Sequence, residues 1–268
     1  MYNLAYAYFK RDGIIELSYK FSFFVQMLGN VVLLVIFYYI GQMTLGKEIP
    51  ALTRYGGSYL AFLLIGLALT ECVSVSLTTF AKQIREGQLT GALEITLLSP
   101  VSLTRLLLYS ALWPYFISAI RFFVYLIIGM YFYHVGFDKA DVGSALVIFA
   151  LVVIAFAGLG MCWASVVLLI KRGEAILTVM SYLFVVLSGV LFPQSLLPKW
   201  LQQLAQWIPL THGLEGMRLA LLQGVSLSEQ LDRLLILSLF SVVLILMGIA
   251  AFHVAVRIAK EEGSLAQY

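Results

Sequence analysis

Charged residues are scarce in this chain. Lys, Arg, Asp and Glu make up only 12% of its 268 residues, whereas 62% of the residues are hydrophobic and the mean hydropathy is +0.96. A typical soluble domain carries about 25% charged residues. The composition therefore excludes an ordinary soluble domain and predicts a membrane protein.

Cysteine and catalytic motifs are scarce as well. The two cysteines, Cys72 and Cys162, both fall inside long apolar stretches, so neither a disulfide nor a metal role is expected. No serine or cysteine is visibly paired with a histidine, and the sequence has no HExxH motif. We therefore predict no catalytic residue, cofactor-binding residue or metal ligand in this chain.

Linkers, low-complexity tracts and an apolar leader are also missing from the sequence. The first twenty residues include Lys10, Arg11 and Glu16 and lack a continuous apolar core, so no cleavable signal peptide is predicted. Residues 2–9 are rich in aromatic side chains and end in a charged cluster, which is typical of a helix lying in the membrane interface. We expect a single membrane domain over residues 1–268, with a frayed polar leader as the alternative for the amino-terminal segment.

Six apolar stretches are long enough to cross the roughly 30 Å hydrocarbon core of a bilayer. They are residues 21–43, 58–81, 106–133, 143–170, 175–192 and 234–256. The fifth, with 18 residues, is the shortest. Because a helix satisfies its own backbone hydrogen bonds in lipid, the predicted fold is an all-α membrane protein with six transmembrane helices.

Lysine and arginine are divided unevenly between the two sides of this topology. The side that holds both termini and residues 82–105 carries ten of them, and the opposite side carries six although its loops are longer. The positive-inside rule therefore places both termini in the cytoplasm. The formal net charge of +3 reflects this asymmetry, and nothing in the sequence indicates nucleic-acid binding.

The polar segment 82–105, KQIREGQLTGALEITLLSPVSLTR, separates the second and third apolar stretches. Its leucines recur at helical spacing, at Leu89, Leu93 and Leu97. They line one face of a short amphipathic helix, which ends at Ser99-Pro100 because proline has no N–H to donate. Ser102 can cap the next span. We predict a short cytoplasmic helix, in a position to receive force from outside the membrane.

The region between the last two apolar stretches predicts two short helices separated by proline. Pro198 opens the first helix and Pro209 breaks it, while Gly224 is suited to end the second. The first helix has an apolar face bordered by tryptophan, at Trp200, Leu201, Leu204, Trp207 and Ile208. Ser226 and Glu229 match a capping box before the last span. We interpret this region as a re-entrant hairpin entering from the outer side, with two helices lying flat on the membrane as the alternative.

Two charged residues fall clearly inside predicted spans. Ionisable side chains at such depths are costly and usually face a partner or an aqueous path. By their distance from the cytoplasmic ends of their helices, Glu71 and Arg121 differ in depth by roughly 9 Å, which a long arginine side chain can partly bridge. The sequence is compatible with two roles for these residues: an ion pair between neighbouring spans, or a contact with a substrate.

Two further patterns carry weaker signals. His212, Glu215 and Arg218 recur every three residues, which favours an ion-pairing ridge at the outer mouth, since two possible ligands do not complete a metal site. Residues 41–47, GQMTLGK, match most of a phosphate-binding P-loop, but Glu48 stands where Ser or Thr is required. The match also follows a predicted membrane helix rather than a strand, so no ATP site is expected there.

Two of these regions resemble the ABC type-2 transporter permeases. After the second span, members of the family usually have a motif close to ExGTLExLLxTPxS. This chain has similar residues there, although the segment LTGA is inserted into the motif. The residues that match are Glu86, Gly87, Leu93, Glu94, Leu97, Leu98, Pro100 and Ser102. The segment SGVLFPQSLLPKWLQQLAQWIPLTHGLEGMR is similar to the family's stretch before the last span. The residues that match are Phe192, Pro193, Leu197, Pro198, Pro209, Leu210, Thr211, Glu215 and Arg218.

The resemblance implies a permease subunit that forms half of a translocation path. Such a chain pairs with a second copy or a related permease, and with two copies of a cytoplasmic ATPase subunit that bind the ATP and magnesium. It would lie in the plasma (inner) membrane of a bacterium, and most members export. The residues implied to couple to the ATPase are Glu86, Gly87, Leu89, Leu93, Glu94, Leu97 and Pro100. Those implied to form an outer gate are Phe192, Pro193, Pro198, Pro209, His212, Glu215 and Arg218.

The cargo and one competing class stay open at this point. The amino-terminal region does not resemble the polysaccharide-exporting branch, so we favour a lipophilic or amphiphilic cargo: a lipid, a drug, a peptide or a glycoconjugate. The alternative function is a self-contained channel or ion-coupled carrier that uses Glu71 and Arg121. Inverted repeats would support that alternative, and the sequence shows none.

Overall fold

The computed structural model describes five continuous segments of the chain. These are residues 2–18, 50–55, 58–91, 102–170 and 174–261, together with single helical positions at Val25, Gly29, Val32, Val35, Ile36, Tyr38 and Tyr39. Every regular element within the described segments is helical, which confirms the all-α prediction. Most of the predicted first span, the P-loop-like residues 41–47 and most of the predicted coupling helix lie outside the described residues.

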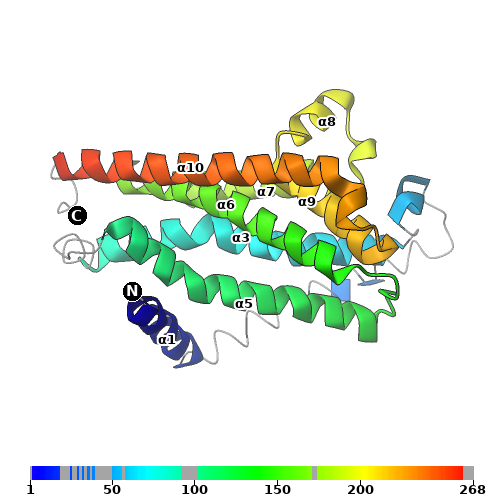
Figure 1. The fold of residues 1–268 in the computed structure, drawn as a ribbon, viewed down its shortest axis with the longest axis horizontal. Helices are drawn as coiled ribbons and strands as arrows, with labels where there is room; N and C mark the ends of the chain where they lie inside the picture. The colour runs from blue at the N-terminus through cyan, green and yellow to red at the C-terminus, as the bar shows by residue number, and fades with distance from the viewer. Residues whose placement is uncertain are drawn as a thin grey trace.

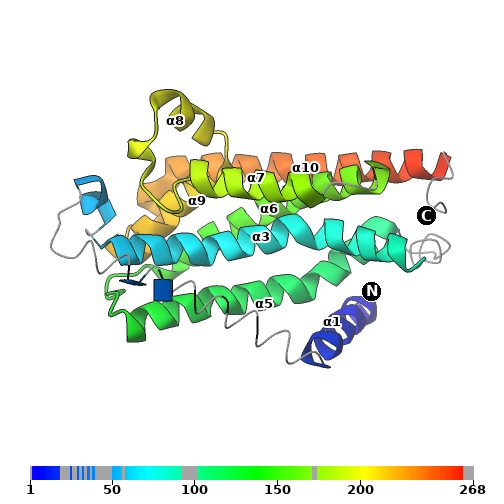
Figure 2. The ribbon, with the colours of Figure 1, turned by 180° about the vertical axis from the view of Figure 1, so that it is seen from behind.

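Four long helices form an elongated bundle (Figures 1 and 2). They are α3 (Tyr59–Leu89), α5 (Leu103–Phe132), α6 (Val142–Ile170) and α10 (Leu231–Glu261). Each is long and apolar enough to cross a membrane, and together they correspond to the second, third, fourth and sixth predicted spans. The start of α1 and the end of α10 lie at the end of the bundle where α3 terminates (Figure 1).

The fifth predicted span is shorter in the structure than the sequence indicated. Helix α7 (Glu174–Leu187) has 14 residues and therefore measures about 21 Å, less than the hydrocarbon thickness. The chain leaves the helix after Leu187 because Gly189 has a φ of +77°, which is left-handed backbone that glycine adopts without a Cβ clash. The residues up to Phe192 therefore form a turn instead of a fifth turn of helix.

Helix α6 packs closely against α3 on one side and α10 on the other. The approach depends on glycine: a Cβ at Gly158 would overlap the backbone of Leu244, and one at Gly160 would overlap the carbonyl of Ser76. Gly248 of α10 faces Gly158 in the same way. In lipid, where helices gain no hydrophobic energy by associating, such close backbone contact is the main source of attraction between them.

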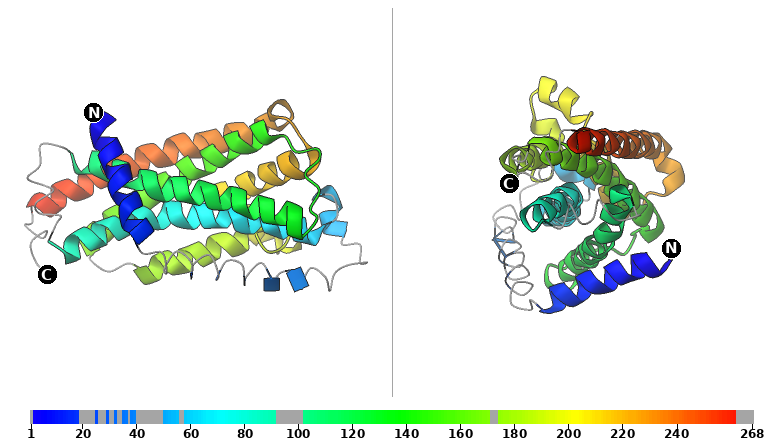
Figure 3. Two further views of the ribbon diagram at one scale, coloured as in Figure 1. Left: turned by 90° about the horizontal axis from the view of Figure 1, so that it is seen from below. Right: turned by 90° about the vertical axis from the view of Figure 1, so that its left-hand side faces the viewer.

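Helix α1 (Tyr2–Ser18) lies across the outside of α5 at a steep angle to the bundle (Figure 3). It is held there by aromatic contacts, with the Phe9 ring 5.0 Å from the ring of Trp113 and 5.5 Å from that of Phe116. This crosswise position fits the predicted interfacial helix, but the helix continues well past residue 9. The second half of α1 therefore contacts α5 through side chains that the prediction did not include.

The region before α10 folds into five short elements. They are η2 (Gln194–Leu196), α8 (Lys199–Ala205), α9 (Pro209–Arg218), the π-helical turn η3 (Leu219–Gln223) and η4 (Leu227–Gln230). Gly224 ends η3 in the left-handed conformation with φ of +71°, as predicted. The Glu229 carboxylate accepts a hydrogen bond from the Ser226 N–H at 3.2 Å, so the predicted capping box is present.

Helix α8 projects from the side of the bundle, whereas α9 lies back among the long helices (Figures 1 and 2). At the same end, η1 (Pro50–Tyr55) precedes α3, and Asp141 caps the start of α6. The Asp141 carboxylate accepts hydrogen bonds from the hydroxyl and the backbone N–H of Ser144, which lower the pKa of Asp141. The cap is therefore ionised at neutral pH, where a negative charge at a helix N-terminus is favourable.

Candidate functional site

The structure brings Glu71 and Arg121 together at the interface of α3 and α5. The Arg121 Nη1 atom lies 2.9 Å from the Glu71 Oε1 atom. Arg121 is almost fully buried, while about a quarter of the Glu71 side chain is exposed. The predicted difference in depth is thus closed by the arginine side chain, and the interpretation as an ion pair between neighbouring spans is confirmed.

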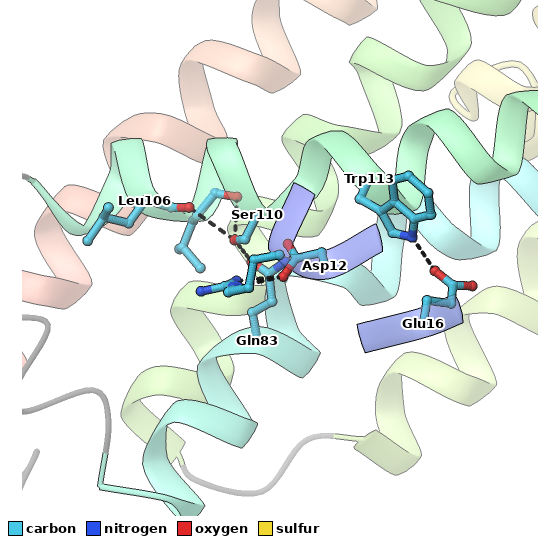
Figure 4. A network of polar contacts seen from close by, with 8 residues as sticks. Asp12, Glu16, Gln83, Leu106, Ser110 and Trp113 are labelled. Atoms are coloured by element: carbon cyan, nitrogen blue, oxygen red, sulfur yellow. Dashed lines mark hydrogen bonds and ion pairs between the residues drawn. The ribbon is translucent and has the colours of Figure 1, made fainter. Parts of the chain in front are cut away.

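Glu16 is a third member of this charge cluster. Its Oε1 atom lies 3.8 Å from the Nη2 atom of Arg121, and its Oε2 atom accepts a hydrogen bond from the indole N–H of Trp113 (Figure 4). The cluster therefore joins α1, α3 and α5. The sequence contained a signal for this contact, because Phe9, Gly13 and Glu16 are spaced along one face of a helix. The prediction missed it by ending the interfacial helix at residue 9.

Polar contacts continue along the interface of α3 and α5 towards the end of α3. The Ser110 hydroxyl donates to the Gln83 side-chain oxygen at 2.5 Å (Figure 4). Between this contact and the charge cluster, the Cys72 thiol donates to the Ser118 carbonyl at 3.4 Å. The interface therefore combines polar bonds at several depths, which fixes the register of the two helices. Within the described residues, no group of three or more His, Cys, Asp or Glu side chains could hold a metal ion.

The residues predicted to couple to an ATPase fall into two groups. Glu86, Gly87 and Leu89 lie in the last turns of α3, which continues eight residues beyond the predicted end of the second span. The start of the predicted separate helix is therefore corrected: α3 breaks only after Leu89, at the Thr90–Gly91 turn. Leu93, Glu94, Leu97 and Pro100 lie outside the described residues. Ser102 is the N-cap residue of α5, as predicted, although its side chain makes no capping hydrogen bond.

The end of α3 has one buried and one exposed side. Gln88 is buried and donates a hydrogen bond to the carbonyl of Leu168 on α6 at 3.4 Å. Leu89, one residue further on, is 62% exposed. The last turns of α3 are thus fixed to α6 while presenting an apolar side chain at the tip of the bundle.

The predicted outer-gate residues lie in the short elements around α8 and α9. Pro198 is the N-cap residue of α8 and Pro209 the first residue of α9, as predicted. Phe192 and Pro193 belong to the turn after α7. Gln194 fastens this turn: its amide donates to the Leu187 carbonyl at 3.2 Å and to the Thr211 hydroxyl at 3.0 Å.

His212, Glu215 and Arg218 all lie on α9, and each has a different set of partners. His212 donates to the carbonyl of Gln206 at 2.9 Å. The Glu215 Oε1 atom lies 2.7 Å from a nitrogen of Arg54 on η1 and 3.0 Å from a nitrogen of Arg233 on α10. Ion pairing is therefore confirmed for Glu215, and its partners come from other elements.

Arg218 is buried at the interface of α9 and α3. Its guanidinium carbon lies 3.3 Å from the centre of the Phe62 ring. The guanidinium also donates to two carbonyl oxygens, that of Phe62 at 3.2 Å and that of Val190 at 3.1 Å. Among the described residues no carboxylate is in direct contact with Arg218, and its buried charge is stabilised by a cation–π interaction and charge-assisted hydrogen bonds. Arg218 thus joins α3, α9 and the turn after α7.

The helices described here define an all-α integral membrane protein with a crosswise amino-terminal helix and a broken helical segment before the last span. The sequence model of the ABC-2 family transporter protein matches residues 39–250. The chain therefore belongs to the ABC-2 transporter family, as the two sequence motifs indicated. No curated protein matches the chain.

Proposed function

We propose that this chain is the permease subunit of an ATP-driven exporter. It would form half of the translocation path, pair with a second copy or a related permease, and work with two copies of a separate cytoplasmic ATPase subunit that binds ATP and magnesium. The observation that carries the proposal is the family match over residues 39–250. By the same family resemblance and the lysine and arginine distribution, we place it in the plasma (inner) membrane of a bacterium with both termini in the cytoplasm.

The end of α3 supports a site of coupling to the ATPase. Residues 82–89 extend the membrane helix beyond the predicted apolar span, and Leu89 is exposed at its tip. A ligand-driven change in the ATPase can move the permease only if the two make contacts that differ between states. We propose that Glu86, Gly87, Leu89, Leu93, Glu94, Leu97 and Pro100 provide these contacts.

The coupling proposal is tested by Leu93→Asp. A charge in place of an apolar side chain of the coupling segment should weaken ATPase docking. We therefore expect the ATPase to co-purify at about one tenth of its normal amount or less and export to fall in parallel. The measurement is a pull-down from the native host with mass spectrometry, followed by a transport assay.

A matched control keeps this test specific. Leu196→Asp introduces the same change at an exposed leucine on the opposite end of the bundle, and should leave ATPase binding unchanged. Normal ATPase recovery and normal export with Leu93→Asp would remove this segment from the mechanism. If the wild-type chain purifies without any ATPase, the permease proposal itself is wrong.

We further propose that the region from the α7 turn to α9 closes the outer end of the path. Its support is the set of bonds that hold this region in place: Gln194 joins the turn to α7 and α9, and Arg218 joins α9 to the long helix α3. Phe192, Pro193, Pro198, Pro209 and His212 would shape this gate. The cargo that we propose is a lipophilic or amphiphilic molecule, such as a lipid, a drug, a peptide or a glycoconjugate.

A channel or ion-coupled carrier is the second candidate function. The observation that favours it is the charge cluster of Glu16, Glu71 and Arg121, since intramembrane ionisable groups often line ion paths. The two functions differ in their need for a partner. A carrier would move its substrate in vesicles that contain this chain alone, whereas a permease would do so only with its ATPase and ATP.

A further inference from the structure

The elements η1 and α9 and the start of α10 lie at the end of the bundle opposite the chain termini (Figure 1), and each contributes one arginine near the carboxylate of Glu215. Arg54 of η1 and Arg233 of α10 contact Glu215 directly and Arg218 of α9 interacts with it at longer range, so these four side chains have a formal charge of +2. The same four charged side chains interact electrostatically with the Tyr55 hydroxyl. Burial raises the pKa of Tyr55, so its hydroxyl stays protonated.

The carboxylate occupies only a small part of the donor capacity of the cluster. Arg54 and Arg233 each place one Nη2 atom against the same oxygen, Oε1 of Glu215. A guanidinium has five N–H donors in a planar fork, a geometry suited to phosphate or carboxylate oxygens. The side chains of Arg54 and Arg233 are 58% and 30% exposed, so both can be reached from outside the protein.

The surroundings of Arg233 are apolar on the lipid-facing side. Ile236, Val243 and Met247 follow it on one face of α10 and are all exposed. A hydrocarbon chain lying along this face would bring a headgroup to the level of Arg233. An amphiphile with an anionic head therefore matches both the charge of the cluster and the surface next to it.

We propose that Arg54 and Arg233 bind the anionic headgroup, of the phosphate class, of a membrane amphiphile, in competition with Glu215. Its oxygens would accept hydrogen bonds from both guanidiniums, and the buried charge of Arg218 would add to the attraction. This site goes beyond the proposed permease function and does not depend on it, because binding needs neither ATP nor a partner chain.

The test is native mass spectrometry of the purified protein with phosphatidylglycerol and with phosphatidylcholine. We expect wild type to retain phosphatidylglycerol about tenfold more strongly. The double variant Arg54→Gln and Arg233→Gln should lose this preference, and Arg54→Gln alone, at the more exposed position, should weaken it. Arg257→Gln is the matched control, because it removes one positive charge from the opposite end of the bundle.

Glu215→Gln separates a binding site from a structural ion pair. If an anion competes with Glu215, this variant should bind phosphatidylglycerol more tightly than wild type, since both guanidiniums become free. A purely structural cluster gives no such gain. Equal retention of the two lipids by wild type, an unchanged preference in the Arg54→Gln and Arg233→Gln variant, or no gain with Glu215→Gln would overturn the proposal.

Inorganic phosphate distinguishes the two sources of the anion. If millimolar phosphate displaces phosphatidylglycerol, the site recognises the phosphate group alone and can take a free anion. If the lipid stays bound, the hydrocarbon chain contributes and the ligand is the whole amphiphile. The variant Arg54→Lys and Arg233→Lys keeps both charges but lacks the guanidinium fork, so it should retain only part of the preference in either case.

Discussion

Replacing Arg121 by glutamine is expected to lower the free energy of unfolding by about 3 kcal/mol, at the lower end of what the loss of one partner from a buried ion pair costs. The change removes the 2.9 Å contact to Glu71 and also the nearby partner of Glu16, and leaves both carboxylates without their cation. We choose the lower end because Glu71 is partly exposed. The measurement is denaturant-induced unfolding in detergent, with Arg105→Gln on the exposed side of α5 as the control.

A double-mutant cycle shows whether this loss comes from the pair itself. Glu71→Gln combined with Arg121→Gln removes both charges, so the double variant should be milder than the sum of the two single variants. Simple additivity of the two effects would contradict direct pairing. Adding Glu16→Gln extends the cycle to α1, and we expect a smaller coupling there because the contact to Arg121 is 3.8 Å long.

The second large effect is expected for Gly158→Leu, which should cost at least about 3 kcal/mol and prevent the protein from accumulating in the membrane. A Cβ at this position would overlap the backbone of Leu244, and a backbone cannot rotate away as a side chain can. The side chain would therefore force α6 and α10 apart along their whole contact.

The comparison for this variant is Val147→Leu, on the same helix but at an exposed position. It adds a methylene group on the lipid side, where nothing has to move. The amount of folded protein in the membrane and its thermal unfolding temperature report both effects. Wild-type accumulation of Gly158→Leu would show that α6 and α10 do not pack as closely as the glycines indicate.

Sequence reasoning succeeded for features that depend on local chemistry. Four of the six predicted spans correspond to long helices of the structure, because long apolar stretches form helices in lipid irrespective of their neighbours. Pro198, Pro209 and Gly224 mark element boundaries in the structure because their backbone constraints act within one or two residues. The family was predicted from two motifs, and the match over residues 39–250 confirms it.

Features that depend on tertiary contacts were predicted less well. The polar residues after Ala81 were assigned to a loop and a new helix, but Lys, Gln, Arg and Glu are good helix formers, and α3 continues through them. The ridge interpretation treated His212, Glu215 and Arg218 as neighbours on one face. The partners of Glu215 and the Phe62 partner of Arg218 come from η1, α10 and α3, far away in the sequence, and no local pattern could have identified them.

The uninterrupted length of α3 has a mechanical consequence. Its 31 residues form a rod about 46 Å long, with no proline between Tyr59 and Leu89 to act as a hinge. A tilt of about 5° about one end would displace the other by about 4 Å for a rod of this length. Arg218 attaches to one tip through the Phe62 carbonyl, and the exposed Leu89 lies at the other. A displacement of α3 at Leu89 would thus move the other end of the helix, and with it α9, without any bend in the helix between them.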